Sequence, residues 1–187
     1  LSREVDLVLA IPRGGVVVGK VVAEKLKLPV GLVVTGKIGV PGQEELAIGA
    51  VDSDGEVTWD KELMLRLGLT QKELVSQIKN AKSKIKNYQE KFRIKELDLK
   101  GKRVVVVDDG VATGATMKAA IGYVKRKGAR QITVAVPVCS VEAEAELKQM
   151  ADEVVCLSVP EYFGAVGQFY ERFPQVTDRQ VIDILQS

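Results

Sequence analysis

Mainly apolar runs alternate with helical patterns along most of this 187-residue chain. The runs at 5–11, 30–35, 104–107, 131–138 and 154–159 each have the length of one strand and lack regular polar alternation. Such runs are typical of parallel strands that are buried on both faces. Helical patterns follow at about 16–28, 115–124 and 142–150. This order predicts an α/β fold with a doubly wound, mostly parallel sheet and helices on both faces.

Two segments interrupt the alternation. Residues 47–51 and 56–59 flank the turn Asp52-Ser53-Asp54-Gly55, which predicts a hairpin at the sheet edge. A long helix follows, opened by Thr70 and Glu73 as a capping box. Its apolar stripe consists of Leu74, Ile78, Ala81, Ile85, Tyr88 and Phe92. We expect a single domain over 1–187, with a helical insertion at about 60–96 and a C-terminal hood or tail at about 160–187 that ends in a short helix from Thr177 and Asp178 to Leu185.

The amino-acid composition is that of a globular domain. An apolar share of 46%, a charged share of 28% and a net charge of +2 are ordinary for a globular domain. No apolar stretch reaches the ~18 residues that span a bilayer and no signal sequence begins the chain, so a cytoplasmic location is the default expectation. The chain has no histidine, which removes the commonest general base and zinc ligand. Cys139 and Cys156 lie far apart in apolar segments and are predicted to be buried free thiols.

Basic residues flank the stripe of the long helix. They are Lys79, Lys82, Lys84, Lys86, Lys91, Arg93 and Lys95. A nucleic-acid surface is one interpretation of this pattern. The residues lie on both sides of the stripe, however, and the net charge is low, so a solvated helix that packs on the core or on a second subunit is favoured.

The strand at 104–107 ends abruptly in Asp108 and Asp109, and a small-residue loop from Gly110 to Gly114 leads into a helix. The N–H groups and the positive end of the dipole at a helix N-terminus attract an anion, and Thr113 and Thr116 can add hydroxyl donors. The two carboxylates would repel a phosphate unless they bind ribose hydroxyls or a bridging divalent cation. A plain Asp-Gly turn with a threonine cap is the alternative. A Walker phosphate loop fits worse, because no Lys-Ser or Lys-Thr pair follows the glycines.

Two further loops carry glycine beside a cation. Pro12-Arg13-Gly14-Gly15 breaks the first strand, where the glycines permit unusual backbone angles and Arg13 offers a planar fork for phosphate oxygens. A plain strand-to-helix turn is the alternative. Residues 36–45 place three glycines and one proline around Lys37, which predicts a mobile loop, with a surface hairpin as the alternative.

These motifs, together with Ala-Val-Gly-Gln-Phe-Tyr at 165–170, resemble those of the type I phosphoribosyltransferases and follow in the same order along the chain. Their residues resemble one branch of this family, whose acceptor is unassigned. The resemblance implies that Asp108 and Asp109 hold the ribose of phosphoribosyl diphosphate (PRPP). It assigns Ala112, Thr113, Gly114, Ala115 and Thr116 to the 5-phosphate, and Arg13, Gly14 and Gly15 to the pyrophosphate. The resemblance also implies that residues 36–45 form a lid and that Lys37 in this lid reaches the departing pyrophosphate. It favours a homodimer.

The chain departs from this family at Gly36 and at its start, and Ala112 separately bears on the acceptor. Gly36 stands where a basic residue commonly precedes the lid lysine, which weakens a two-cation clamp on pyrophosphate. Ala112 replaces the aspartate that handles the purine proton in enzymes for 6-oxopurines, so hypoxanthine and guanine are disfavoured. The chain also begins almost on its first strand, so we expect that a helical segment of the hood is missing.

Five of the nine aromatic residues lie in the last quarter of the chain, and Tyr162 and Phe163 are the candidates for stacking on an acceptor base. A hydrophobic cluster that holds the tail is the alternative. The resulting hypothesis is Mg²⁺-dependent transfer of the phosphoribosyl group from PRPP to a nitrogen nucleophile, a small-molecule acceptor, with release of pyrophosphate. Arg13, Lys37, Asp108 and Asp109 are the predicted catalytic residues, and the acidic pair would meet Mg²⁺ only indirectly, through PRPP. A PRPP-sensing regulator of RNA or of a protein partner, and a phosphate-releasing hydrolase, are the alternatives.

Overall fold

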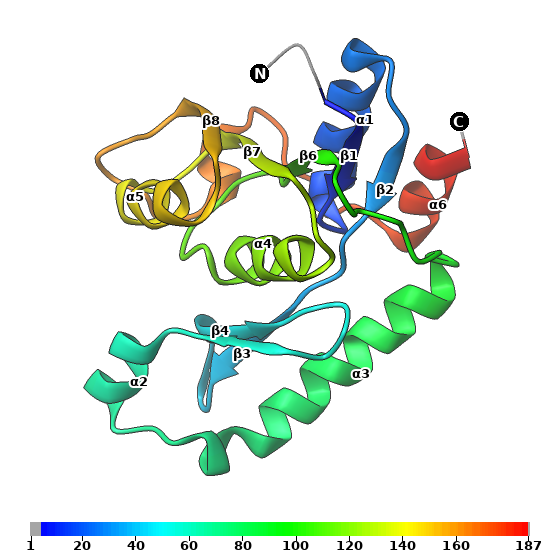
Figure 1. The fold of residues 1–187 in the computed structure, drawn as a ribbon. Helices are drawn as coiled ribbons and strands as arrows, with labels where there is room; N and C mark the ends of the chain where they lie inside the picture. Colours follow the sequence, from blue (N-terminus) through cyan, green and yellow to red (C-terminus); the bar gives the residue numbers. More distant parts are fainter. Residues whose placement is uncertain (1–4, 187) are drawn as a thin grey trace.

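The computed structural model describes residues 5–186 and centres on a five-stranded parallel sheet. Its strand order is β2-β1-β6-β7-β8 (Figure 1). The strands are β1 (Leu7–Ala10), β2 (Val30–Leu32), β6 (Arg103–Val107), β7 (Gln131–Val138) and β8 (Glu153–Ser158). All four pairings are parallel, which confirms the predicted doubly wound sheet.

Helices cover both faces of this sheet. They are α1 (Gly14–Leu26), α4 (Ala115–Arg126) and α5 (Val141–Met150). Alternate residues of β1 and β6 pack in opposite directions, one set with Met117 of α4 and Leu147 of α5, the other with Ala23 of α1. Burial on both faces explains why these strands carry no polar alternation.

A second, antiparallel sheet lies beside α4 and corrects two expectations (Figure 1). It contains β3 (Gly36–Val40), β4 (Gln43–Val51) and β5 (Val57–Trp59). The predicted hairpin at the turn 52–55 does form between β4 and β5, but in this separate sheet and not at the edge of the central one. The expectation of a loop without secondary structure at 36–45 was wrong, because this segment forms the β3–β4 hairpin, which was the alternative that the sequence allowed.

The glycines of the β3–β4 hairpin explain the error, because they serve packing and a turn. A Cβ atom on Gly36 would lie 3.0 Å from the carbonyl oxygen of Ala81, and one on Gly39 would lie 2.5 Å from that of Glu44. Gly42 has a φ of 78° in the turn itself. The many glycines of this segment are therefore explained by close contacts with neighbouring backbone and by a tight turn, and not by a loop.

The helical segment that follows packs its apolar stripe on the small sheet. It contains α2 (Lys61–Leu67), a 3₁₀ turn (Gln71–Leu74) and α3 (Val75–Lys91). The Glu73 carboxylate accepts a 2.8 Å hydrogen bond from the N–H of Thr70, as the capping box predicts. The hydroxyl of Thr70 also donates to this carboxylate at 2.8 Å and does not cap the N–H of Glu73. Ala81 and Ile85 of the stripe are buried against residues of β3 and β4.

The chain ends in α6 (Asp178–Gln186), which packs on α1 and on the end of α3. Between β8 and α6 the chain forms only one 3₁₀ turn, Val166–Phe169. Both cysteines are free thiols, but only Cys139 is fully buried, and burial raises its pKa to about 12. None of the helices within 5–186 is both long and apolar enough to cross a membrane.

Candidate functional site

The acidic pair lies where β6 ends, as predicted. The side chains of Asp108 and Asp109 are half-buried, and the N–H of Asp109 donates a 2.9 Å hydrogen bond to Oδ1 of Asp108. Within residues 5–186, no lysine or arginine forms an ion pair with either carboxyl group. Desolvation raises the pKa of both groups, and the neighbouring charge of Asp109 raises that of Asp108 further. An ionised pair here therefore calls for hydroxyl donors or a cation from a ligand.

The first glycine loop lies directly against this pair. A Cβ atom on Gly14 would lie 1.6 Å from Oδ2 of Asp109, and one on Gly15 would lie 2.8 Å from both the Cα and Oδ1 of Asp108. No residue other than glycine fits at either position without movement of the acidic pair. The Pro12–Arg13 peptide bond that leads into this loop is cis. The structure thus brings together two segments that lie more than ninety residues apart in the sequence.

The loop from Val111 to Gly114 turns into α4 through Gly114, which has a φ of 74°. The first helical hydrogen bond runs from the N–H of Lys118 to the carbonyl oxygen of Gly114 at 2.8 Å. The N–H groups of 115–117 therefore have no partner within the helix, and together with the helix dipole they suit an anion. Ala112 and Thr113 are exposed at this surface.

Ser140 anchors this loop from the neighbouring strand and was not predicted as a site residue. Its hydroxyl donates a 2.7 Å hydrogen bond to the carbonyl oxygen of Ala112, and its N–H donates to that of Val111 at 2.9 Å. The same hydroxyl oxygen caps α5 by accepting from the N–H of Ala143 at 3.1 Å. The only sequence signal for Ser140 is its position as a helix cap after β7.

Arg13 is held by the C-terminal helix. Its Nη1 atom lies 3.3 Å from Oδ1 of Asp178, and the other oxygen of Asp178 accepts a hydrogen bond from Lys91. The hydrogen bond from Lys91, followed by that from Arg13, lowers the pKa of Asp178. The sequence predicts Asp178 only as the start of a helix, because Arg13 and Lys91 lie far from it along the chain.

Lys37 lies in the small sheet and not beside Arg13. It is exposed on β3 and pairs in register with Ala50, so the two side chains share a face of the sheet. Ala50 packs with Ala115 and Ala119 of α4. The structure places Lys37 on the α4 side of the hairpin, outside the set of described residues that line the cavity at Arg13.

The two predicted stacking residues and Asp109 line different cavities. Tyr162 and Phe163 line a cavity of about 650 Å³ with Ala112, Thr113 and Ser140, and Tyr162 is 88% exposed. A cavity of about 630 Å³ beside Asp109 is lined instead by Arg13, Gly14, Tyr170 and Phe173, among others.

Tyr170 connects the C-terminal segment to the acidic pair. Its hydroxyl donates a 2.6 Å hydrogen bond to the carbonyl oxygen of Asp109. Desolvation and the charges of Asp109 and Asp108 raise its pKa to about 12. Sequence reasoning did not single out Tyr170, although it ends the Ala-Val-Gly-Gln-Phe-Tyr motif on which the resemblance partly rests.

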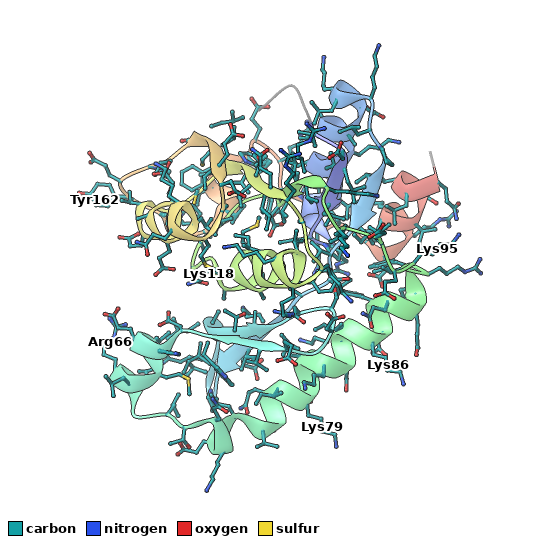
Figure 2. The ribbon with its side chains drawn as sticks, viewed as in Figure 1. Arg66, Lys79, Lys86, Lys95, Lys118 and Tyr162 are labelled. Carbon is teal, nitrogen blue, oxygen red and sulfur yellow. The ribbon has the colours of Figure 1, made fainter. Side chains whose placement is uncertain are left out.

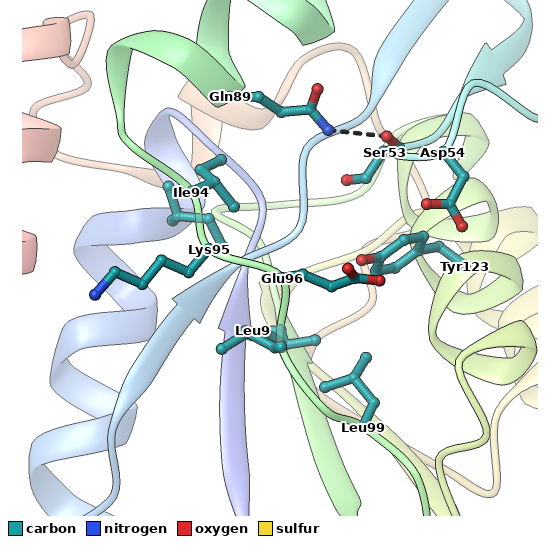
Figure 3. Close-up of a pocket in the computed structure, with 11 residues that line it drawn as sticks. Leu9, Ser53, Asp54, Gln89, Ile94, Lys95, Glu96, Leu99 and Tyr123 are labelled. Atoms are coloured by element: carbon teal, nitrogen blue, oxygen red, sulfur yellow. Dashed lines mark hydrogen bonds between the residues drawn. The ribbon is translucent and has the colours of Figure 1, made fainter.

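A third cavity, of about 330 Å³, shares no lining residue with the other two (Figure 3). It lies among the turn 52–55, the end of α3, the linker at 94–99 and Tyr123 of α4. The amide of Gln89 closes one side by donating to the carbonyl oxygen of Ser53 at 2.8 Å. Lys127 pairs with Glu96 at 3.0 Å and with Asp54 at 3.3 Å, which neutralises the two carboxylates at its rim.

Relatives of known structure share this arrangement of elements. A protein from Thermus thermophilus, TT1426, is 42% identical and superposes with a TM-score of 0.79 over 97% of this chain and 87% of its own. The adenine phosphoribosyltransferase of Giardia lamblia, solved with 9-deazaadenine, is 14% identical with a TM-score of 0.50, covering 84% of this chain and 71% of its own. The second likeness is one of fold alone.

Sequence comparison assigns the family. Two Mycobacterium tuberculosis proteins, from strains CDC 1551 and H37Rv and provisionally named phosphoribosyl transferases, are each 38% identical over 99% of this chain. The chain spans 42% of the length of these relatives. The family profile of the phosphoribosyl transferase domain matches residues 1–173. The chain therefore belongs to the phosphoribosyl transferase domain family.

Proposed function

We propose that this domain transfers the 5-phosphoribosyl group of PRPP to a small-molecule nitrogen nucleophile and releases pyrophosphate, in a reaction that needs Mg²⁺. The contact of Gly14 and Gly15 with Asp109 and Asp108 is the observation that carries the proposal. This contact joins the glycine loop at 12–15 to the two carboxylates that would bind ribose, and the N–H groups at the start of α4 follow directly after these carboxylates in the chain.

The ribose and the 5-phosphate of PRPP would each bind to a different group of this domain. The carboxylates of Asp108 and Asp109 would accept hydrogen bonds from the two ribose hydroxyls, which favours their ionised form. The N–H groups at the start of α4 and the hydroxyls of Thr113 and Thr116 would hold the 5-phosphate. The acidic pair then lies beneath the ribose ring and stabilises the positive charge that develops there as the bond to pyrophosphate breaks.

The pyrophosphate would lie on the 12–15 loop, where Arg13 can neutralise its growing charge. Arg13 is already held at this position by Asp178, so little side-chain entropy is lost when the diphosphate binds. Lys37 would add a second positive charge if the β3–β4 hairpin closes over the loop. Closure would also exclude water, which protects the activated ribosyl centre from hydrolysis.

The acidic pair also fits a divalent cation. Two half-buried carboxyl groups with no cationic partner in the described chain suit the ribose hydroxyls of Mg²⁺-PRPP, so they would meet the ion only indirectly, through PRPP. When bound, Mg²⁺ supplies positive charge to the diphosphate. Asp108 and Asp109 would act on the ion only through the ribose that they bind.

The test is release of pyrophosphate from PRPP in the presence of Mg²⁺ and a mixture of nitrogenous acceptors. We expect release by the wild-type domain and its loss in Asp109→Asn. The matched control is Asp98→Asn, because Asp98 is exposed and contacts only the nearby N–H of Lys100. Release of inorganic phosphate without any acceptor would instead identify a hydrolase.

A PRPP-sensing regulator is the second candidate, and the basic face of α3 is the observation that favours it. Lys79, Lys86 and Lys95 project outward from this part of the molecule (Figure 2). However, Lys86 pairs with Glu90 at 3.9 Å, and Lys91 is engaged by Asp178. Because these acidic partners neutralise part of the basic surface, we favour the transferase over the regulator. RNA retention that depends on both salt and PRPP would reverse this preference.

A further inference from the structure

The cavity beside Asp109, called the slot below, is lined largely by aromatic and branched apolar side chains. Tyr170 and Phe173 form one side, with ring centroids 4.9 Å apart and an interplanar angle of 38°. Val17 and Val18 of α1 contribute apolar surface. Phe173 is 47% exposed and Val17 is 44% exposed, so both have apolar surface available to a ligand. A slot of aromatic and branched apolar groups gains more from an aromatic ring than from a diphosphate.

The slot is fixed in place relative to the acidic pair. The 2.6 Å hydrogen bond from the hydroxyl of Tyr170 to the carbonyl oxygen of Asp109 ties one wall to the residue that would hold ribose. Gly14 and Asp109 themselves line the cavity. A ring in the slot therefore lies next to the expected position of the ribosyl group, which is the arrangement that a direct transfer needs.

The charges around the slot favour an anionic ligand. Its charged lining residues are Arg13, Arg172 and Asp109. Asp178 already engages Arg13, whereas Arg172 forms no ion pair within residues 5–186. A guanidinium group binds a carboxylate through two parallel hydrogen bonds. Arg172 is therefore the residue that can bind an acidic substituent on the ring.

Among the described residues that line the slot, none is left available to accept a proton from the nucleophile once ribose is bound. The chain contains no histidine, and position 112 in the phosphate loop is alanine. Asp109 supplies the one carboxyl group among the described lining residues, and in the proposed function the ribose hydroxyls occupy it. A nucleophile with a lone pair and no proton to lose needs no general base.

We propose, building on the function proposed above, that the acceptor is a planar heteroaromatic carboxylate whose attacking ring nitrogen carries no proton, of the pyridine type. Its ring lies between Tyr170, Phe173 and Val17, and its carboxylate pairs with Arg172. The nitrogen lone pair forms the bond to C1 of the ribose while the bond from C1 to the pyrophosphate oxygen breaks, and that electron pair leaves with pyrophosphate. No proton is transferred, and the ring nitrogen becomes positively charged.

Two probes of nearly equal shape test this proposal. Pyridine-3-carboxylate carries the negative charge and pyridine-3-carboxamide does not. We expect the wild-type domain to prefer the carboxylate at least tenfold, in calorimetric affinity with ribose 5-phosphate present and in pyrophosphate release with Mg²⁺-PRPP. Arg172→Gln should remove the preference by weakening the carboxylate alone, and Phe173→Ala should weaken both probes. Arg179→Gln is the control, because Arg179 is an exposed residue of α6 outside the slot.

Binding of Mg²⁺-PRPP in the same samples separates the two proposals. Both slot variants should bind PRPP as the wild type does. If wild type binds PRPP but neither probe, or binds both probes equally, the acceptor assignment is wrong and the transferase proposal stands. The assignment is also wrong if Arg172→Gln weakens inhibition by pyrophosphate, because the guanidinium then serves the diphosphate. If wild type does not bind PRPP, both proposals fail.

Discussion

Gly14 and Asp109 are packed so closely that a single methyl group cannot be placed between them. The Cβ atom of an alanine at position 14 would lie 1.6 Å from Oδ2 of Asp109. This contact joins the loop that follows β1 to the acidic pair that follows β6, and the two strands pair in parallel register directly below. The two halves of the proposed PRPP site are therefore positioned by one glycine.

Gly14→Ala should consequently displace Asp109 while leaving the sheet intact. We expect at least a tenfold loss of affinity for Mg²⁺-PRPP, and a destabilisation of about 1–3 kcal/mol from overpacking. Gly122→Ala is the matched control. Its Cβ would lie 3.5 Å from Nη1 of Arg126, an ordinary contact in the interior of α4, so stability should be unchanged or higher. Equal PRPP affinity in both variants, measured by calorimetry, would contradict the arrangement of the site.

Asp108→Asn should stabilise the free protein and weaken the liganded one. The pKa of Asp108 is raised by burial and by Asp109, so the folded state binds more protons than the unfolded state above the ordinary pKa of 3.8. Wild-type stability therefore falls as the pH rises through the interval between 3.8 and the raised pKa, and it stays lower above that interval. At pH 7 we expect Asp108→Asn to raise Tm by about 2 °C or more.

The difference in Tm between Asp108→Asn and wild type should shrink as the pH falls toward 3.8, since the carboxyl group then starts to be protonated in the unfolded state as well as in the folded state. Thermal denaturation between pH 4 and pH 8 measures this. A lower Tm for Asp108→Asn across the whole range would show that the carboxyl group serves the fold and not a ligand.

Asp178→Asn should have the opposite pH dependence. The pKa of Asp178 is lowered by Lys91 and Arg13, so its contribution to stability is present above the ordinary value of 3.8 and is lost as the pH falls through the lowered value. The variant should be less stable than wild type at neutral pH and approach it in acid. Arg13 would also lose its positioning partner, so we expect weaker inhibition by pyrophosphate. A variant with unchanged pyrophosphate inhibition would remove Asp178 from the positioning of Arg13.

Ser140→Ala should loosen the phosphate loop. The hydroxyl of Ser140 both caps α5 and holds the carbonyl oxygen of Ala112, so its loss should cost about 1 kcal/mol of stability and also weaken ribose 5-phosphate. Thr70→Ala is the matched control, because it removes a helix-start hydroxyl far from the loop along the chain. Both variants should lose stability, and only Ser140→Ala should lose phosphate affinity. Equal affinity in the two variants would leave Ser140 with a purely structural role.

The central strands and the acidic pair were predictable because their signals are local. Val104 to Val107 are buried on both faces, and the run therefore shows in the sequence as four apolar residues that end at Asp108. The β3–β4 hairpin was expected only as an alternative to a loop, because the local sequence does not reveal the close contacts of Gly36 with Ala81 in α3 and of Gly39 with Glu44 in the paired strand.

The site residues that the sequence did not reveal act through long-range contacts. Tyr170 binds the backbone of Asp109 across 61 positions, and Asp178 binds Arg13 across 165. Neither has a local pattern that distinguishes it from an aromatic cluster or a helix cap. Lys37, in contrast, stood out locally as a lone cation among glycines, yet the structure places it on a strand of the small sheet.

Calorimetric titration of Mg²⁺-PRPP tests the central claim most directly, with wild type compared with the double variant Asp108→Asn/Asp109→Asn and with ribose 5-phosphate as the second ligand. We expect wild type to bind PRPP in a Mg²⁺-dependent manner and the folded double variant to lose at least tenfold in affinity. Ribose 5-phosphate should bind more weakly, because it leaves the 12–15 loop empty. No PRPP binding by folded wild-type protein, or equal binding by the double variant, would contradict the account.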